Sequence, residues 1–532
     1  MFDFLIPVIR PLYFVTLCAL FYVPAKHALH MYQQNRYEIR RYLQWFTASL
    51  STSLFPIIGA VVLGIVMSFI ITMMGVFGQL IVLVILAWTA IHDVNKERRK
   101  HYIKPLKVTT RVKRQIVVLT VMNLVLITVM VSHYLLSPLP LIALMYATSI
   151  VHILLILMAA ITIPLEALIK AFYMGLAARE LRRNNNLMIV GIAGSYGKTS
   201  SKNILNEILS EQYYTLATPA SFNTPMGITL TIRNELKNLH QVFIAELGAD
   251  KVGDLSVLMK FVKPKYGILT SIGPEHLNTF KNIQNIIKEE TKIVEMLPAD
   301  GVAVVNGDNE YIRAYTFKNP VKRLTVGIEY PDVDYRAISI AFTPEGSVFE
   351  IVSAEGSVPF KTRLLGKHNI TNILVAVALG RELGLSWPLL QKAVANVNYI
   401  EHRLQLKKIN GLTYIDNAFN SNPEGSLSSL EVLKMMPGRR YIVTPGMIDL
   451  GDQQRLYNYQ FGKAMLGCAD QVLLVGPTQS KPIYEGLADS GFPMEDVRVF
   501  DTVKEAFAYL DQHASPKDTI LLENDLPDAF NR

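Results

Sequence analysis

Two long stretches without a charged residue constrain this 532-residue chain more than any other feature. No Asp, Glu, Lys or Arg occurs between Arg41 and Asp93, and none occurs between Arg114 and Glu166. Apolar runs of about 20 residues have the length and composition of helices that cross a membrane. We therefore predict a helical transmembrane domain over residues 1–170, built from five apolar segments at about 4–24, 53–74, 77–93, 115–136 and 140–165.

The distribution of charge indicates the orientation of this domain. Residues 1–183 hold 18 Lys and Arg against 6 Asp and Glu, whereas residues 184–532 hold 34 against 38. The cations gather after the first, third and fifth apolar segments, and the two other connections carry no charge. Because basic loops stay on the cytoplasmic side, we predict a multi-pass protein of a bacterial cell membrane with everything after residue 170 in the cytoplasm. The third segment is short, so a re-entrant or interfacial segment is the alternative.

The same charge distribution limits the kinds of partner that the protein is expected to bind. A mildly acidic second part argues against a nucleic-acid partner. The basic and aromatic loop at 29–46 is predicted either to contact membrane lipids at anionic headgroups or to be an ordinary loop between spans. Cys18 and Cys468 lie far apart, which suggests neither a disulfide framework nor a cysteine-based zinc site.

A phosphate-binding loop follows the predicted membrane domain. An apolar, β-rich run at 187–192 leads into a glycine-rich turn and then into an amphipathic stretch at 202–209. Such a turn wraps backbone N–H groups around phosphates at the start of a helix, so we predict ATP contacts from Gly194, Ser195, Tyr196, Gly197, Lys198, Thr199 and Ser200. Lys198 would reach the terminal phosphates, and the Thr199 hydroxyl would ligate Mg²⁺. Ile192 stands where the general pattern has its first glycine, so a purely structural turn is the alternative.

Further motifs follow in a fixed order over about residues 188–460. They are A-G-S-Y-G-K-T-S (193–200), F-N-T-P-M-G (222–227), A-E-L-G-A-D-K-V-G-D (245–254), S-I-G-P-E-H-L (271–277), N-G-D-N (306–309), G-K-H-N-I-T-N (366–372), I-D-N-A-F-N-S-N-P (415–423) and G-M-I-D-L-G (446–451). As a set they resemble the Mur ligase family, and most closely its branch that adds D-alanyl-D-alanine to a muramoyl tripeptide.

The resemblance implies a fold and an activity. The fold is α/β, with a P-loop central domain at 185–400 and a Rossmann-like C-terminal domain at 401–532. Short strands at 321–363 are predicted to form a small sheet within the central domain. The implied activity is an ATP-dependent ligase that forms an amide bond through an acyl phosphate. Its substrates would be a peptidoglycan precursor and an amino acid or dipeptide amine.

The resemblance also implies roles for individual residues. The implied catalytic residues are Lys198, His276, Arg403 and Asp416. The implied magnesium ligands are Thr199, Glu246, His276 and Glu290. The implied contacts to the nucleotide, beyond the phosphate loop, are His368, Asn369, Asn372 and Arg403.

Two departures from the family pattern matter. Glu290 falls where the family carries a carbamylated lysine, so we expect Glu290 to supply that carboxylate directly, with Lys288 or Lys292 as the alternative. The predicted membrane domain also occupies the place of a soluble domain that grips the UDP-sugar in relatives. The precursor is therefore either UDP-linked and held differently, or lipid-linked.

Two other classes of function compete with the ligase. An ATP-driven transporter would need polar groups along its spans and a second ATPase motif. The predicted spans carry few polar groups, and the sequence has no second ATPase motif. A non-catalytic membrane scaffold would not need the intact set of Lys198, Thr199, Glu246, His276 and Arg403.

Overall fold

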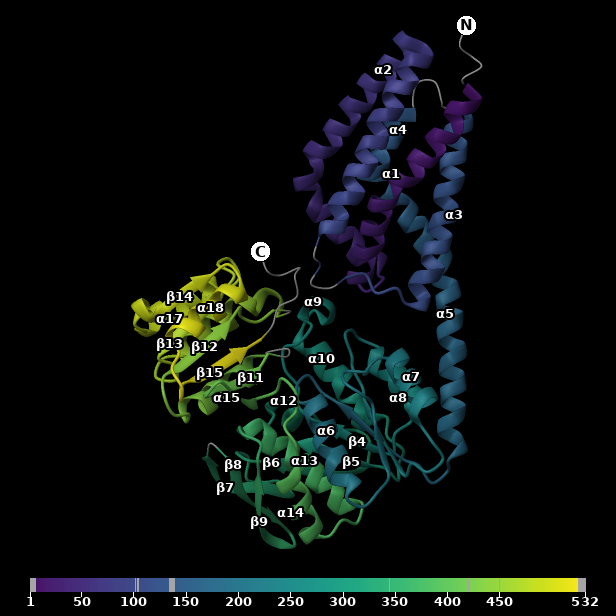
Figure 1. Cartoon of the computed structure of the whole chain (residues 1–532). Helices are drawn as coiled ribbons and strands as arrows, with labels where there is room; N and C mark the ends of the chain where they lie inside the picture. The colour runs from purple at the N-terminus through teal and green to yellow at the C-terminus, as the bar shows by residue number, and fades with distance from the viewer. Residues whose placement is uncertain are drawn as a thin grey trace. The chain divides into compact units, whose positions relative to one another are not determined.

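The computed structural model describes residues 6–100, 102, 105–133, 139–343, 345–418, 422–448 and 450–524 (Figure 1). The chain divides into two compact units, Met1–Ala171 and Phe172–Arg532. We call them the helical unit and the α/β unit. Parts of two predicted motifs, at 419–421 and 449, and the C-terminal residues 525–532 lie outside the described residues.

The helical unit consists of long apolar helices. They are α1 (Ile6–Gln34), α2 (Ile39–Arg99), α3 (Thr110–His133), the short α4 (Leu139–Met145) with a π-helical turn (Tyr146–Ile150), and α5 (Val151–Arg183), whose last turns belong to the α/β unit. Within the described residues, four helices are long and apolar enough to cross a membrane: Pro7–Gln34, Ile57–Arg99, Thr110–Ser132 and Val151–Arg183.

Helix α2 is two helical legs joined by a reversal. Gly75 has φ 58° and ψ −128°, a conformation outside the helical region. A Cβ on Gly78 would lie 2.5 Å from the Ile70 carbonyl oxygen, eight residues earlier in the chain. Residues eight apart along one straight helix are about 12 Å apart. The chain therefore turns back at Gly75, between the apolar segments predicted at 53–74 and 77–93.

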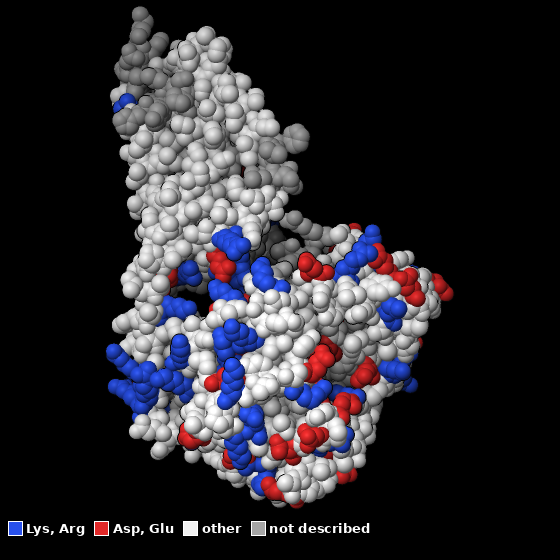
Figure 2. All heavy atoms as spheres, turned by 180° about the vertical axis from the view of Figure 1, so that it is seen from behind, with Lys and Arg blue, Asp and Glu red and all other residues white. Residues whose placement is uncertain are grey.

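The basic segments of the helical unit meet at one end of the bundle. Lys26 near the end of α1 forms an ion pair with Glu97 near the end of α2, at 2.7 Å. The Gln33 side chain exchanges two hydrogen bonds with the Lys107 backbone, at 2.8 and 2.9 Å. Figure 2 shows the remaining visible surface of this unit nearly without charged side chains. This segregation is typical of a membrane protein whose charged residues flank its spans.

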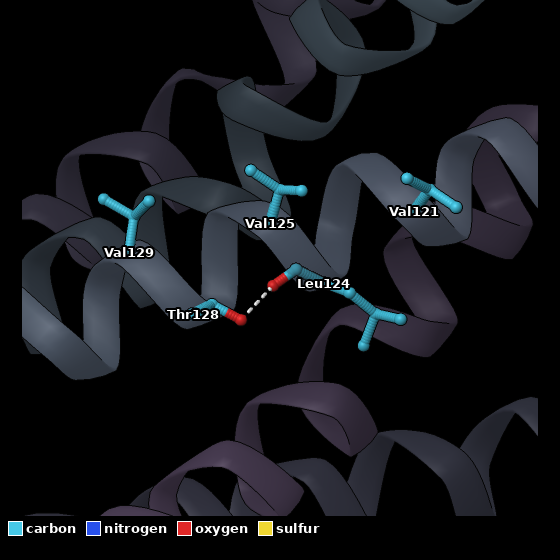
Figure 3. Close-up of a pocket in the computed structure, with 5 residues that line it drawn as sticks. All are labelled: Val121, Leu124, Val125, Thr128 and Val129. Atoms are coloured by element: carbon cyan, nitrogen blue, oxygen red, sulfur yellow. Dashed lines mark hydrogen bonds between the residues drawn. The ribbon is translucent and has the colours of Figure 1, made fainter.

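The outer surface of the bundle is suited to lipid. Large apolar side chains such as Phe69, Trp88 and Val125 are exposed there. Figure 3 shows a shallow hollow on α3, lined by Val121, Leu124, Val125, Thr128 and Val129. Its one hydroxyl, on Thr128, donates to the Leu124 carbonyl at 2.8 Å. Polar groups facing hydrocarbon must be satisfied within the protein, and this one is.

A nine-stranded sheet forms the first half of the α/β unit. Its order is β2-β3-β1-β4-β5-β6-β7-β8-β9, parallel from β2 to β7 and antiparallel from β7 to β9. The strands are β1 (Met188–Ala193), β2 (Thr215–Ala217), β3 (Val242–Glu246), β4 (Tyr266–Leu269), β5 (Val302–Asn306), β6 (Lys322–Gly327), β7 (Tyr335–Thr343), β8 (Gly346–Ser353) and β9 (Gly356–Thr362). The short strands predicted at 321–363 therefore form, but they extend the main sheet and do not build a separate one.

Helices cover both faces of this sheet. They are α6 (Lys198–Ser210), α7 (Pro225–Glu235), α8 (Asp254–Val262), α9 (Leu277–Phe280), α10 (Ile283–Glu290), α11 (Lys292–Glu295), α12 (Glu310–Ala314), α13 (Lys367–Glu382) and α14 (Trp387–Asn396). The parallel strands are apolar on both sides, because each side packs against a helical layer. Val190 and Ile192 of β1 face the layer that includes α6 and α13, and Ala193 joins the core on the other face.

A second sheet, of six strands, forms the C-terminal half. Its order is β10-β11-β15-β12-β13-β14, parallel except for the β10–β11 pair. Its strands are β10 (Gln405–Ile409), β11 (Leu412–Asn417), β12 (Arg440–Thr444), β13 (Gln471–Val475), β14 (Val497–Phe500) and β15 (Thr519–Glu523). Its α-helices are α15 (Pro423–Lys434), α16 (Gln454–Ala464), α17 (Lys481–Ser490) and α18 (Val503–His513). The predicted α/β class is confirmed.

Candidate functional site

The predicted phosphate loop joins the end of β1 to the start of α6. Gly194 has φ 130° and Gly197 has φ 82°, in the region that favours glycine. A Cβ on Gly194 would lie 2.3 Å from the Thr270 hydroxyl oxygen, so only glycine fits there. Ser195 is held by bonds to Ser271 and Gly273, and the Tyr196 hydroxyl donates to the Pro274 carbonyl at 2.9 Å. The loop lies at the carboxyl edge of a parallel sheet, where α/β folds bind ligands.

Lys198 opens α6 and folds back over the loop. Its ammonium donates to the carbonyls of Gly194 and Ser195, the latter at 2.9 Å, and lies 3.6 Å from Glu275. Burial lowers the pKa of Lys198, but nearby carboxylates outweigh it, so the pKa is raised. A lysine that stays charged in a buried phosphate loop is suited to bind the terminal phosphates of a nucleotide.

Glu246, at the end of β3, contacts polar groups from α6 and from the loop before α7. Its carboxylate accepts from the Thr199 hydroxyl at 3.1 Å and from the Asn223 amide at 3.3 Å. Lys202 forms a buried ion pair with it at 3.1 Å. The sequence motifs did not single out Lys202, although its position one turn after Lys198 on α6 was a usable signal.

The chemistry of these groups fits a magnesium ion. The carboxylate of Glu246 and the hydroxyl of Thr199 are hard oxygen ligands. Over the described residues, no cluster of three or more His, Cys, Asp or Glu side chains could hold a metal ion. Mg²⁺ commonly takes one or two carboxylates and completes its shell with phosphates and water, so a pair of protein ligands is in keeping with it.

His276 lies on the loop after β4, at the start of α9. Its backbone is left-handed, with φ 51°. Its Nε2 atom lies 3.3 Å from the Asp250 carboxylate and 3.5 Å from that of Glu275. Asp250 and Glu275 therefore join the residues around the loop, which the sequence had not identified.

Glu290 binds the phosphate loop itself. Glu290 is buried at the end of α10. Its carboxylate accepts a hydrogen bond from the Gly194 backbone N–H, with 2.7 Å between nitrogen and oxygen. Burial raises the pKa of Glu290 to about 7, against the lowering effect of the Lys198 charge. Lys292 points elsewhere, to Glu289 at 2.6 Å. Glu290, and not Lys292, thus lies at the loop; its role as a metal ligand stays a prediction.

The predicted nucleotide contacts lie on the first turns of α13. Asn372 accepts from Ser201 of α6 at 2.9 Å, which brings α13 beside the phosphate loop. Asn369 is buried and donates to the Leu365 carbonyl. His368 is hydrogen-bonded to Ser428 of α15 at 2.8 Å, so it links a helix of the first half of the α/β unit to a helix of the C-terminal half. Burial, with a smaller contribution from the Arg403 charge, lowers the pKa of His368 to about 4.

Arg403 and Asp416 belong to the start of the C-terminal half. Arg403 lies within electrostatic reach of Glu246, Glu275 and Lys198, while its burial lowers its pKa. Asp416 is engaged differently, since its carboxylate accepts from Lys407 at 2.6 Å and from His402 at 2.8 Å. The structure therefore places Arg403 within electrostatic reach of Lys198 in the phosphate loop and holds Asp416 on the six-stranded sheet.

Comparison with known proteins agrees with this arrangement. The Mur ligase middle domain matches residues 192–380, and the Mur ligase glutamate ligase domain matches residues 402–523. The UDP-N-acetylmuramoyl-tripeptide–D-alanyl-D-alanine ligase of Escherichia coli K12 is 28% identical over 305 residues, which cover 57% of this chain and 67% of the relative. The Bacillus subtilis 168 protein of that name is 26% identical over 364 residues, covering 68% and 76%.

Solved structures show the same fold. MurF from Acinetobacter baumannii matches with a TM-score of 0.60 at 25% identity, covering 67% of this chain and 77% of that one. MurF ligase from Thermotoga maritima, solved in complex with ADP, matches with a TM-score of 0.61 at 21% identity, covering 67% and 80%. Since both family domains match in order and the fold agrees, the chain belongs to the Mur ligase family of ATP-dependent carbon–nitrogen ligases.

Proposed function

We propose that this chain is a membrane-anchored amide ligase that joins D-alanyl-D-alanine, or a similar amine, to a peptidoglycan precursor on the cytoplasmic face of a bacterial membrane. The observation that carries the proposal is the meeting of two halves at one loop. Thr199 donates to Glu246 across the sheet edge, and Arg403 from the C-terminal half lies within electrostatic reach of Lys198 and Glu246. The names of the relatives supply the substrate class.

The geometry accounts for the chemistry. A carboxylate is a poor electrophile, because its oxygen is a poor leaving group. Attack of the precursor carboxylate on the γ-phosphoryl group of ATP gives an acyl phosphate and ADP. Attack of the amine on the acyl carbon then forms the amide and releases phosphate. Lys198 and Arg403 are suited to stabilise the charge on the phosphoryl oxygens during transfer. Thr199 and Glu246 would hold Mg²⁺, which neutralises phosphate charge when bound.

The test is a product assay with the full chain in membranes. With ATP, Mg²⁺, UDP-muramoyl tripeptide and D-alanyl-D-alanine, we expect ADP, phosphate and a product whose mass equals the two substrates less one water. Phosphate release should require both the acid and the amine. Equal hydrolysis of ATP without either substrate would instead support an ATP-driven transporter, and failure to bind ATP would support a scaffold.

A lipid-linked precursor is the second candidate. The observation that favours it is the set of four apolar helices within the described residues, which would hold the site near a bilayer. The same assay, repeated with the muramoyl peptide on a polyprenyl diphosphate, distinguishes the two. Turnover of the lipid-linked acid alone would select this candidate, whereas turnover of the soluble UDP-linked acid would exclude a requirement for the lipid.

A further inference from the structure

The basic end of the helical unit contains a backbone turn under strain. Between α1 and α2, the consecutive residues Arg36 and Tyr37 have φ 56° and 58°. Left-handed backbone costs a non-glycine residue about 1–2 kcal/mol, and such strain is concentrated at ligand-binding and functional sites. The turn is also tied to the segment before α3, because Gln33 donates to the Tyr37 hydroxyl at 2.8 Å and bonds the Lys107 backbone.

The strained turn places Tyr37 beneath an arginine. The Arg111 guanidinium, in the first turn of α3, lies 4.0 Å from the centre of the Tyr37 ring. The Tyr32 ring meets the Tyr37 ring edge-on, with centroids 5.6 Å apart. Gln115 lies four residues after Arg111, hence on the same face of α3 and about 6 Å away. Side chains from two helices and one turn thus meet at one spot, with Gln115 one turn further along the same face of α3.

Three of these side chains carry polar atoms that lack a protein partner. Over the described part of the chain, no hydrogen bond reaches the Tyr32 hydroxyl, the Arg111 Nε atom, or either amide atom of Gln115. Tyr32 is 1% exposed and Gln115 is 0% exposed. Leaving such a buried group unpaired costs about 1–3 kcal/mol, so native proteins pair nearly all of them. Their concentration at one spot indicates a ligand.

The chemistry of the atoms defines that ligand. The Arg111 Nε and Gln115 Nε2 atoms are donors, and the Tyr32 hydroxyl can also donate, so together they suit an acceptor with several oxygens. Arg111 supplies a full positive charge, and Lys107 and Lys113 are exposed nearby in sequence. A phosphate meets these demands. The Gln115 Oε1 atom is an acceptor and needs a donor, such as a hydroxyl on the same ligand.

The position of the site favours a lipid over a solute. The spot lies beside the contacts that join the basic segments at one end of the bundle, whose outer surface is apolar; this is the level of lipid headgroups. We propose that Arg111, Gln115 and Tyr32, supported by Tyr37, form a binding site for the phosphate headgroup of an anionic lipid that carries an adjacent hydroxyl. This site is separate from the ATP loop and does not depend on the proposed ligase reaction.

The test compares lipids on the full-length protein. The wild-type chain, purified in detergent, is titrated with phosphatidylglycerol or phosphatidylcholine while its thermal midpoint and its bound lipids are followed by native mass spectrometry. We expect phosphatidylglycerol to bind saturably and to raise the midpoint, with little effect from phosphatidylcholine. Glycerol 3-phosphate without acyl chains should not reproduce the effect; an equal response to it would overturn the lipid assignment.

Variants then distinguish a site from general attraction to charge. Arg111→Gln should weaken phosphatidylglycerol binding about tenfold or more, since a charged hydrogen bond is worth roughly 1.5–3 kcal/mol. The matched control Arg98→Gln removes an exposed cation of α2 and should change binding less than twofold. Equal weakening by both variants would mean diffuse attraction and would overturn the site.

Two further variants keep the proposal testable even if Arg111→Gln misfolds. Tyr32→Phe and Gln115→Leu remove buried polar groups that have no protein partner, so without anionic lipid they should unfold at the wild-type temperature or above it. Phosphatidylglycerol should raise the thermal midpoint of each variant by less than it raises that of the wild type. If the midpoints of both variants rise as much as that of the wild type, these atoms do not contact the lipid and the proposal fails.

Discussion

At the scale of single residues, buried charged side chains determine the properties of the phosphate-loop site. Lys198, Glu246 and Glu290 would each be costly to bury alone. Lys198 donates to the Ser195 carbonyl, Glu246 pairs with Lys202, and Glu290 accepts from the Gly194 backbone N–H. The carboxylate of Glu290 accepts from the Gly194 backbone N–H of the phosphate loop, a group that is not itself a predicted metal ligand. Two roles follow for Glu290, positioning the loop or holding Mg²⁺, and they can be separated.

Replacement of Glu290 by Gln tests its role. If the carboxylate holds Mg²⁺, as we expect, Glu290→Gln should lower kcat about tenfold or more and raise the Mg²⁺ concentration for half-maximal activity. If Glu290 only positions the loop, the amide oxygen of Gln can still accept from Gly194, and the Mg²⁺ dependence should stay unchanged. Added bicarbonate should not stimulate the wild type. Stimulation by bicarbonate, with loss of activity in Lys292→Ala alone, would show that a carbamylated lysine serves instead.

His368 should make stability depend on pH. Its pKa of about 4 in the folded chain lies below the ordinary 6.5, mainly because of burial. Below pH 6.5 the unfolded chain takes up a proton that the folded chain does not, so stability present above pH 6.5 is lost as pH falls toward 4. The loss is at most about 1.4 kcal/mol per pH unit. Thermal midpoints in detergent at pH 7 and pH 5 should therefore differ less for His368→Gln than for the wild type.

The control for this prediction is His513→Gln. His513 is exposed on α18, where its Nδ1 atom is hydrogen-bonded to the Tyr509 backbone carbonyl one turn earlier. That variant should keep the wild-type difference between pH 7 and pH 5. A His368→Gln variant with the full wild-type difference would mean that other groups dominate acid destabilisation.

At the scale of elements, turns decide where the chemistry lies. The turn from β1 to α6 requires left-handed backbone at two glycines and close approach to β4, and the reversal within α2 depends on Gly75. In both places an apolar element ends because glycine permits a conformation that other residues adopt only under strain. The atoms around each glycine then determine how much a substitution with a larger residue disturbs the structure.

Gly194→Ala should abolish nucleotide binding. The added Cβ would lie 2.3 Å from the Thr270 hydroxyl and 2.8 Å from the Ser271 carbonyl oxygen, so the loop or the residues that follow β4 must move. Gly253→Ala is the matched control, since Gly253 also has positive φ, at 102°, but nothing lies within 4 Å of its Cβ position. Binding of a fluorescent ADP analogue to the full chain should fall more than tenfold for the first variant and less than threefold for the second. Equal losses would point to backbone strain alone.

At the scale of the whole molecule, the basic end of the helical unit predicts which side of the membrane each loop occupies. Three contacts tie basic segments together at that end: Lys26 to Glu97, Gln33 to Lys107, and Arg114 to Glu166 at 2.7 Å. The reversal at Gly75 carries no charge nearby in sequence. A bundle with all its loop cations at one end is expected to keep that end in the cytoplasm.

Cysteine labelling measures this orientation. In a chain with Cys18 and Cys468 replaced by Ser, Met74→Cys should react with a membrane-impermeant maleimide in intact cells. Lys100→Cys should react only after the cells are opened. Both positions are exposed side chains next to the ends of helical legs, so access to the reagent and not burial decides the result. Labelling of Lys100→Cys in intact cells, with Met74→Cys protected, would reverse the predicted topology.

The sequence by itself determined the parts that depend on local pattern. Charge-free runs predicted the apolar helices, because length and composition alone decide whether a helix suits a bilayer. The ordered motifs predicted the family. They also predicted the phosphate loop, because the glycines that permit the loop's backbone conformation lie within six consecutive residues. Tertiary structure alone decided the partners of those residues. The packing of separate elements pairs Lys202 with Glu246 and brings Glu290 to Gly194. It also places Asp416 beside Lys407, and stacks Arg111 on the Tyr37 ring that Tyr32 meets edge-on. These contacts depend on burial and on distances in the folded chain, and the spacing of residues along the sequence predicts neither.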